Sequence, residues 1–379
     1  MDFDLNEEQR MYHDAVRDFC EKELAPHAAD VDEKGELHWP AIKKMPGLGL
    51  TGMVVPEEFG GADLDTISIA IAIEEIGRVC GSTGLSIAAH NGLGCGPIVK
   101  WGTRDQQEQF LPKLTSGDHL GSLALTEPNA GSDLRGVKTV ARRDGDEWVI
   151  NGHKAWITNP QHAPVIITHC RAEDDGFHMI LIEPDRGGVT IQKPEKKMGV
   201  RGSPTQQIIF EDVRVPAENL LGEPGGGLRQ VLETLDGGRI TIGALSVGLA
   251  QAAFEAAIRY AQQREAFGQP IAKFQAIQWM IADMEVEIEA SRTLVMKAAW
   301  LKDQGRDFHK AAAIAKLKAS ETAEKVGFNA IQIHGSYGYS VEFPVERIYR
   351  DQRLMTIGEG TSEIQRLVIA RNVLQEHGL

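Results

Sequence analysis

Cysteine, positive charge and long apolar runs are all scarce in this sequence of 379 residues. Its four cysteines stand far apart and form no CxxC pair, which argues against a zinc site or a disulfide framework and favours buried free thiols. The 54 acidic residues exceed the 40 Lys and Arg, and the resulting charge of −14 opposes a nucleic-acid partner, because phosphate binding requires clustered positive charge. No run approaches the roughly 18 apolar residues of a membrane span, and the start lacks signal-peptide features. We therefore expect a cytoplasmic protein without a membrane span.

Nucleotide fingerprints and metal-ligand spacings are also missing. The segment GLGCG at 92–96 runs into Pro97 and does not join a strand to a helix, so close helix packing is expected there. The glycines at 225–227 lack the Lys-Ser/Thr ending of a P-loop. His309 and His334 have no partner at metal-ligand spacing, and no metal site is predicted.

The remaining pattern predicts an α+β fold that is mainly α. Residues 1–119 show helical periodicity and form an expected N-terminal α-helical domain, in which Glu74 and Glu75 are interpreted as surface charges. Residues 120–225 contain short β-rich runs separated by turn residues, which predict a middle β domain. Helical periodicity returns over 226–379, the expected C-terminal α-helical bundle. Asn151-Gly152 predicts a tight hairpin, because both turn positions favour positive φ.

The loop LALTEPNAGSDL at 123–134 has the composition of a site that admits a flat ligand. Thr126 and Ser132 offer hydroxyls, while Ala130 and Gly131 leave space for a ring system or a phosphate. By composition alone, an ordinary turn explains the loop equally well.

Five motifs, TEPNAGSD, AWITN, REAFG, QIHGSYGY and GEGTSEIQR, occur in the order and approximate spacing of the signatures of the acyl-CoA dehydrogenase family. The likeness covers essentially the whole chain, which resembles the short-chain and branched-chain members most. It implies an N-terminal helical domain, a central β-barrel-like domain and a C-terminal four-helix bundle. It also implies FAD as cofactor, an acyl-CoA substrate, an electron-transferring flavoprotein as acceptor, and an assembly that is either a homotetramer, built as a dimer of dimers, or a dimer. The implied pathways are fatty acid β-oxidation and branched-chain amino acid degradation.

The same resemblance assigns residues to the cofactor. The loop from 123 to 132 would line the flavin, with Thr126 near its reactive edge, and Trp156 would cover the ring. Arg264 would hold the diphosphate part of an FAD bound mainly by a neighbouring subunit. Many relatives carry a second glycine where Ser336 stands. The implied cofactor residues are Leu123, Ala124, Leu125, Thr126, Gly131, Ser132, Trp156, Ile157, Thr158, Arg264, Phe267, Gln275, Gln332, Ile333, His334, Gly335, Ser336, Thr361, Ser362 and Glu363.

Glu359 stands between two glycines ahead of a predicted helix, where Ser362 and Gln365 have the spacing of a capping box. By position alone, its carboxylate either compensates a helix dipole or serves catalysis. The family match implies the catalytic base, which removes the α proton of the thioester while the β hydrogen leaves as hydride to flavin N5, giving a trans-2-enoyl-CoA. We expect a dry pocket to raise the pKa of this carboxyl group.

The thioester oxygen would be bound by the backbone N–H of Glu359 together with a ribityl hydroxyl of FAD, again by resemblance. Some relatives carry their base near the segment matched by LDGGR at 235–239, which has no glutamate here. The implied substrate contacts are Ser132, Asp236, Gly237, Gly238, Arg239 and Gly360. Arg239 is alternatively a structural cation.

Two other functions stay open from the sequence. An acyl-CoA oxidase would use oxygen as acceptor, although many oxidases are longer than this chain. A catalytically silent member would only bind FAD or acyl-CoA within an assembly. For the substrate, we expect a short or branched acyl group; glutaryl-type decarboxylation is disfavoured because residues 85–93 contain no arginine.

Overall fold

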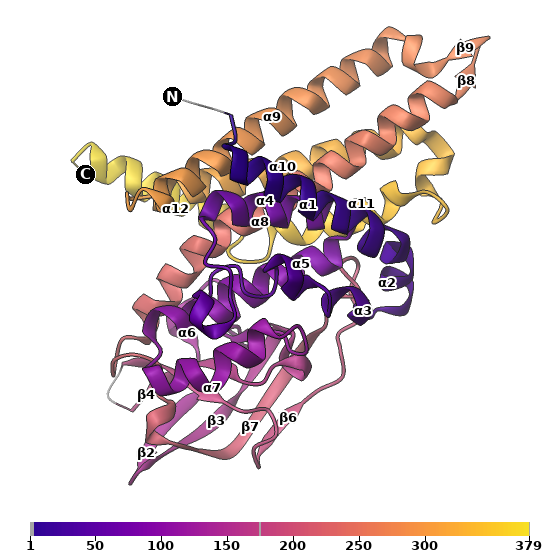
Figure 1. Ribbon diagram of the computed structural model, residues 1–379. Coiled ribbons are helices and arrows are strands. Elements are labelled where there is room, and N and C mark those ends of the chain that lie inside the picture. Colours follow the sequence, from indigo (N-terminus) through magenta and orange to yellow (C-terminus); the bar gives the residue numbers. More distant parts are fainter. Residues whose placement is uncertain (1–3, 174–175, 379) are drawn as a thin grey trace.

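Helices come first along the chain, strands follow and helices return in the computed structural model, which describes residues 4–173 and 176–378 (Figure 1). This order confirms the predicted fold class. The first helices are α1 (Glu7–Phe19), α2 (Ala28–Lys34), α3 (Trp39–Ile42), α4 (Thr66–Val79), α5 (Gly81–Ala89), α6 (Gly96–Trp101) and α7 (Arg104–Thr115). The last are α8 (Gly227–Gln263), α9 (Gln275–Asp303), α10 (His309–His334), α11 (Pro344–Gln352) and α12 (Ser362–Glu376), with a short hairpin of β8 (Glu265–Ala266) and β9 (Gln269–Pro270) between α8 and α9.

The middle part of the chain forms a seven-stranded mixed sheet. Its strands are β1 (Ser122–Ala124), β2 (Val140–Asp144), β3 (Glu147–Thr158), β4 (Ile166–Ala172), β5 (Phe177–Ile182), β6 (Val189–Ile191) and β7 (Thr205–Pro216). They lie in the order β1-β4-β2-β3-β7-β6, and β5 pairs with β4. Within the described residues β1 and β6 do not pair, so the sheet is open, and the barrel-like domain implied by resemblance does not close into a ring.

The tight turn predicted at Asn151-Gly152 is wrong. Strand β3 continues through both residues, and the hairpin turn lies earlier, at Gly145, which has a φ of 61°. The pairing of β3 with β7 shifts register between Ile150 and Gly152, as at a β-bulge. A Cβ added to Gly152 would lie 2.3 Å from Oγ1 of Thr139. The glycine therefore serves a close approach of two chain segments and not a turn.

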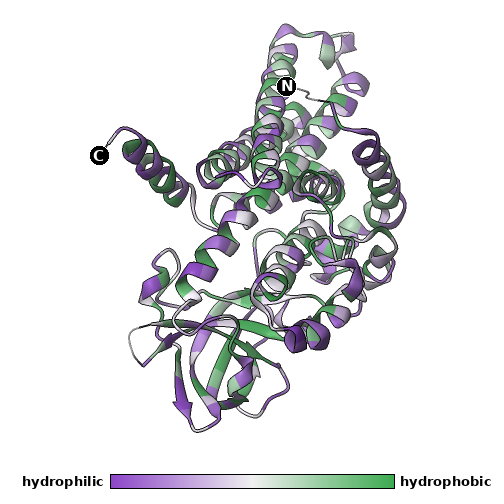
Figure 2. Cartoon of the chain, turned by 60° about the vertical axis from the view of Figure 1, so that its left-hand side comes forward, coloured by the Kyte–Doolittle hydropathy of each residue, from purple (hydrophilic) through white to green (hydrophobic). Residues whose placement is uncertain are grey.

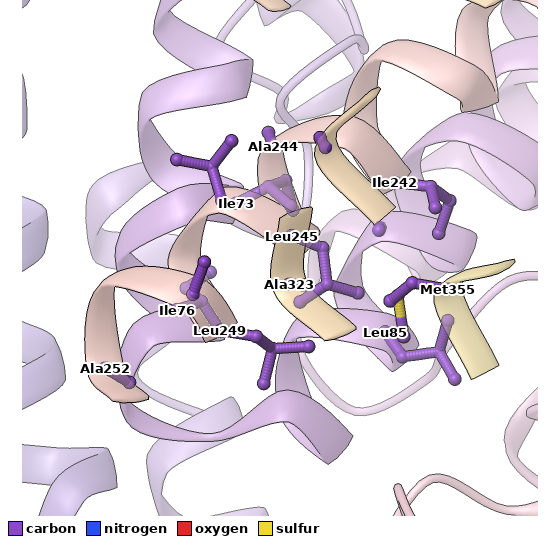
Figure 3. Packing of buried hydrophobic residues seen from close by; sticks show 14 of the residues in the cluster. Ile73, Ile76, Leu85, Ile242, Ala244, Leu245, Leu249, Ala252, Ala323 and Met355 are labelled. Carbon is purple, nitrogen blue, oxygen red and sulfur yellow. The ribbon is translucent and has the colours of Figure 1, made fainter. Parts of the chain in front are cut away.

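Helix α8 is the central element of the helical core. Its Leu245 and Leu249 lie together with Ile73 and Ile76 of α4 and Ala323 of α10 (Figure 3). Among the helices described, α8 is the one long and apolar enough to cross a membrane, yet 89% of its most apolar window is buried inside the protein. That burial is typical of the core helix of a globular protein.

Glycines allow α4 and α8 to touch. A Cβ added to Gly248 would lie 2.2 Å from the carbonyl oxygen of Glu74, and one added to Gly77 would lie 2.6 Å from Leu245. By contrast, the predicted close packing at GLGCG involves one glycine, Gly94, which faces the backbone of Gly121.

The interpretation of Glu74 and Glu75 as surface charges is also wrong. Both are buried, Glu74 with a side-chain oxygen 2.9 Å from Arg292 of α9 and Glu75 with one 2.9 Å from Arg78. Burial raises the pKa of Glu74, and the guanidinium of Arg292 opposes that rise. An arginine beside each acid makes burial tolerable, which the apolar periodicity of the helix did not reveal. The expectation of buried free thiols is confirmed for all four cysteines.

We predict that Gly248→Ala destabilises the protein by about 1–3 kcal/mol, because the new methyl group forces α4 and α8 apart. The midpoint of urea unfolding, followed by circular dichroism, should fall. Gly92→Ala is the matched control, since nothing lies within 4 Å of a Cβ added there. Equal midpoints for the two variants would contradict the tight α4–α8 contact.

Candidate active site

Glu359 lies in a turn just before α12, and its carboxylate reaches across to α8. A Cβ added to Gly238 of α8 would stand 2.0 Å from Oε2 of Glu359. The residue as a whole is half-buried, but Oε2 is completely shielded from solvent and has no hydrogen-bond partner among the described residues. The carboxylate therefore occupies the space that a side chain at Gly238 would fill.

The cap of α12 differs by one residue from the prediction. Thr361 is the N-cap and accepts a hydrogen bond from the backbone N–H of Ile364 at 3.3 Å, whereas Oγ of Ser362 is buried without a partner in the described structure. Gln365 does not complete a capping box. Its Nε2 instead donates to the carbonyl oxygens of Glu359 at 3.3 Å and Gly360 at 3.0 Å, and so fixes the turn that carries the carboxylate.

Burial raises the pKa of Glu359 to about 7, as the sequence analysis expected of a base in a dry pocket. Two cations oppose this rise, first Lys316 of α10 and then Arg239 of α8. Lys316 is fully buried, and its Nζ donates to the carbonyl oxygen of Gly360 at 2.7 Å. Sequence reasoning missed this lysine, because one lysine among several in a helix carries no sign of burial.

Asp236 and Arg239 flank the base along α8. They form a buried ion pair one helical turn apart, and Asp236 Oδ2 also lies 2.5 Å from His309 Nδ1. Nε of Arg239 is buried without a hydrogen-bond partner in the part of the chain described. The structure thus brings the predicted substrate segment of α8 to the predicted base. Arg239 is still open to both interpretations. Its ion pair with Asp236 fits a structural cation, and its unpartnered Nε fits a substrate contact.

A second group of predicted residues gathers at one edge of the sheet. Ser122 Oγ donates to the carbonyl oxygen of Thr158 at 2.8 Å, and the N–H of Ala155 donates to that of Thr126 at 2.8 Å, which places the two predicted flavin segments side by side. Trp156 is 61% exposed, with a φ of 61°. Nothing lies within 4 Å of a Cβ added to Gly131.

Three of the predicted cofactor residues at this edge have side chains that point into the protein. Leu123, Ala124 and Ile157 belong to the buried apolar clusters beneath the sheet edge, so only their backbone groups can meet a ligand. Lys154, which the sequence analysis overlooked, anchors the loop, because its buried Nζ lies 3.0 Å from the carbonyl oxygen of Leu125 and 2.9 Å from Oε1 of Glu127.

The remaining predicted cofactor residues lie elsewhere in the chain. Arg264, Phe267 and Gln275 are exposed at the β8–β9 hairpin, which Figure 1 shows at the opposite end of the molecule from the sheet. The predicted segment from Gln332 to Ser336, which the structure places at the end of α10 and in the turn after it, is close to the same end, because the His334 ring stacks on Tyr260 at 4.3 Å. Along α8, the 22 residues from Gly238 to Tyr260 span about 33 Å. One chain alone therefore does not bring these residues to Glu359.

The predicted cofactor residues offer exposed apolar surface and hydrogen-bond donors, which fit a flat aromatic cofactor with a polar chain. An exposed indole beside open loop backbone fits the ring system, and the buried, unpartnered Oγ of Ser362 offers a hydroxyl next to the base. The exposed Arg264 fits a phosphate group. These observations agree with FAD as the cofactor.

Comparison with known proteins gives one family throughout. Family models described as the N-terminal, middle and C-terminal domains of acyl-CoA dehydrogenase match residues 6–118, 122–213 and 225–374. A probable acyl-CoA dehydrogenase, YngJ, of Bacillus subtilis is 55% identical over 380 residues, which cover 99% of this chain and all of the relative. The human mitochondrial short-chain specific acyl-CoA dehydrogenase is 47% identical over 99% of this chain and 92% of its own length.

Solved structures of the same family are also similar to this chain. Butyryl-CoA dehydrogenase from Megasphaera elsdenii superposes with a TM-score of 0.95 and 40% identity, covering 99% of this chain and all of that one. A chain in a structure that describes the electron transferring flavoprotein of Acidaminococcus fermentans gives 0.96 and 41%, with the same coverage. An acyl-CoA dehydrogenase from Bacillus anthracis complexed with FAD gives 0.94 and 36%, over 99% of this chain and 68% of that chain.

We predict that Gly238→Ala lowers the pKa of Glu359 from about 7 toward its ordinary value, because the methyl group displaces the carboxylate into solvent. Infrared difference spectra against Glu359→Gln would follow the protonated carboxyl band with pH. Gly237→Ala is the control, since a Cβ there meets only Lys302 Nζ, at 3.6 Å. An unshifted titration in Gly238→Ala would contradict the contact.

Proposed function

Because the chain belongs to the acyl-CoA dehydrogenase family, we propose that it oxidises short acyl-CoA thioesters to trans-2-enoyl-CoA with FAD as cofactor and Glu359 as the base. One observation carries this proposal: a carboxylate oxygen of Glu359 is buried without a partner against the bare backbone of Gly238. Several relatives are named acyl-CoA dehydrogenases and one solved relative is complexed with FAD, whereas the short acyl group rests on the names of the short-chain and butyryl-CoA enzymes.

The described residues can carry out the proton transfer. A base with a pKa of about 7 is about half ionised at pH 7, and its ionised form is basic enough to accept a carbon-bound proton. The α proton passes from the substrate to the Glu359 carboxylate, and the bond it leaves supplies the electrons of the new double bond. When bound, FAD supplies the acceptor for the β hydrogen as hydride.

The backbone at Glu359 can stabilise the enolate that develops on the thioester. Among the described residues no hydrogen bond from the Glu359 N–H is found, so this donor is available to the thioester oxygen. One such preorganised donor is typically worth about 3 kcal/mol of transition-state stabilisation. Gln365 and Lys316 hold the turn by its carbonyl oxygens and leave this N–H unused.

An electron-transferring flavoprotein is the proposed acceptor. Support comes from the close structural match to a chain in a structure that describes the electron transferring flavoprotein of Acidaminococcus fermentans. An oxidase would instead produce hydrogen peroxide in air, in amounts equal to the enoyl-CoA formed and without a carrier protein. The silent alternative is disfavoured, because the buried base and its neighbouring cations are all present.

An oligomer is supported by what one chain leaves exposed. Phe267 at the hairpin is 96% exposed, and α12, which stands away from the body in Figure 2, exposes Leu367 and Leu374. The predicted cofactor residues of the hairpin are also far from the base of their own chain, so a neighbouring subunit would complete each FAD site. The homotetramer, the cytoplasmic location and the pathway stay predictions.

We predict that Glu359→Gln keeps its bound FAD but slows anaerobic bleaching of the flavin by butyryl-CoA about 10²–10⁴-fold, the usual contribution of a positioned base. In the unmodified enzyme, kcat/KM should rise with pH through about 7, because only the ionised carboxylate accepts the proton. Stopped-flow absorbance measures both. Glu321→Gln, which removes a surface partner of Arg366, is the control. Bleaching of Glu359→Gln at the normal rate would overturn the assignment.

We predict that Arg264→Ala loses FAD affinity, and that an equal mixture of Arg264→Ala and Glu359→Gln chains regains activity when the two are co-expressed. A hybrid site then combines an intact Glu359 from one chain with an intact Arg264 from the other. Activity of the purified hybrid, isolated by two different tags, measures this. A hybrid without recovered activity would show that both residues act in the site of the same chain.

A further inference from the structure

Lys316 differs from the other lysines around it on α10. Lys318 and Lys325 reach outward and pair with the carboxylate of Glu287 on α9. Lys316 has no exposed surface, and within the described ranges no carboxylate oxygen lies within 4.0 Å of its Nζ. The Gly360 carbonyl oxygen, at 2.7 Å, is the partner that its ammonium contacts. Its side chain thus ends at the turn that carries Glu359.

An ammonium in this position is unfavourable for folding. Burial in low dielectric disfavours the charged form, and it lowers the pKa of Lys316 to about 8. One neutral carbonyl replaces the water shell of the ion only in part, so an apolar side chain of similar length would pack here at lower cost. The position of Lys316 therefore fits a role in the site better than a role in stability.

The turn beside Lys316 needs to be held. Glu359 has a φ of 52° and Gly360 one of 90°, so two consecutive residues adopt the left-handed conformation, which is unfavourable for a glutamate. Two side chains hold the carbonyl groups of this turn, Gln365 from α12 and Lys316 from α10. Their hydrogen bonds fix where the Glu359 backbone and its carboxylate point.

Lys316 also differs from the other cation near Glu359, because its charge is not paired. The cations that act on the carboxylate are Lys316 from α10 and Arg239 from α8, and Glu363 is an acid on α12 that acts on Lys316. Arg239 is already paired with Asp236. Lys316 forms no such ion pair in the described structure. Its charge is therefore less neutralised than that of Arg239 and acts more strongly on the Glu359 carboxylate.

We propose that Lys316 is a positioning residue for the base: by holding the Gly360 carbonyl it fixes the left-handed turn, and its unpaired charge favours the ionised form of the Glu359 carboxylate. This inference rests on the proposed role of Glu359. It makes the base a unit of two residues, Lys316 from α10 and Glu359 from the turn before α12. The lysine contacts neither the thioester nor the reacting carbon in this arrangement, and it acts only through Glu359 and Gly360.

The test compares Lys316→Met, Lys316→Arg and Lys318→Met as holoenzymes. Lys316→Met removes the charge and keeps the length of the side chain, whereas Lys318→Met removes a charge from the same helix that pairs with Glu287 instead. Infrared difference spectra against the corresponding Glu359→Gln double variants report protonation of Glu359 without any turnover. Stopped-flow bleaching by butyryl-CoA then gives the pH profile of kcat/KM and the plateau rate.

We expect Lys316→Met to move the titration of Glu359 and the acidic limb of kcat/KM together to higher pH, because loss of a positive charge favours the protonated carboxyl group. The plateau rate should also fall about tenfold to a hundredfold, the effect expected when a reacting group is misplaced. Lys316→Arg should keep the titration at or below the normal pH and recover part of the rate. Lys318→Met should change neither quantity.

Two outcomes overturn the proposal: an unshifted Glu359 titration with a normal plateau rate in Lys316→Met, or an equal shift in Lys318→Met. If Lys316→Met does not fold, a titration displaced to higher pH in Lys316→Arg is the contradicting result. A failure of the proposed function has a different signature. Glu359→Gln would then bleach at the normal rate, while the infrared titration still shows whether Lys316 acts on Glu359.

Discussion

The contact between the Glu359 carboxylate and the backbone of Gly238 is the constraint on which the rest of the site depends. It requires a residue without a side chain on α8, and it requires the chain before α12 to turn back toward the bundle through two left-handed residues. Helix α8 links this contact to the sheet, to the helical core and to the exposed hairpin. It begins beside the sheet, passes the base at Gly238, forms the centre of the helical core at Leu245 and ends at the exposed hairpin. A core helix of 37 residues thus sets the distances between the parts of the site.

The same contact explains the electrostatics. A carboxylate enclosed against a helix loses its water, and its pKa rises to about 7. That value suits a base but makes ionisation less favourable, and the cations Lys316 and Arg239 limit the rise. The turn itself is held by hydrogen bonds to its carbonyl groups, while the Glu359 N–H stays available. Position, charge and a free donor therefore meet at one residue.

Sequence reasoning recovered what depends on local pattern and on recognisable motifs. The order of helices and strands and the buried thiols followed from it, while the role of Glu359 stays a prediction. It failed where tertiary contact decides. Asn151-Gly152 has the composition of a turn, but Gly152 is required by the proximity of Thr139. Glu74 has the composition of a surface acid, but Arg292 from a helix far along the chain makes its burial possible. No local pattern could mark Lys316, because its role arises only when α10 meets the turn before α12.

The central claim is that Glu359 removes the α proton, and exchange of hydrogen with solvent tests it most directly. The enzyme is incubated in D2O with an acyl-CoA analogue that carries sulfur at the β position and cannot be oxidised, and proton NMR follows the signal of the α hydrogens. We predict that the unmodified enzyme exchanges an α hydrogen of the analogue and that Glu359→Gln, with its FAD still bound, does not. Exchange by Glu359→Gln at the rate of the unmodified enzyme would contradict the account, because another group would then have to be the base.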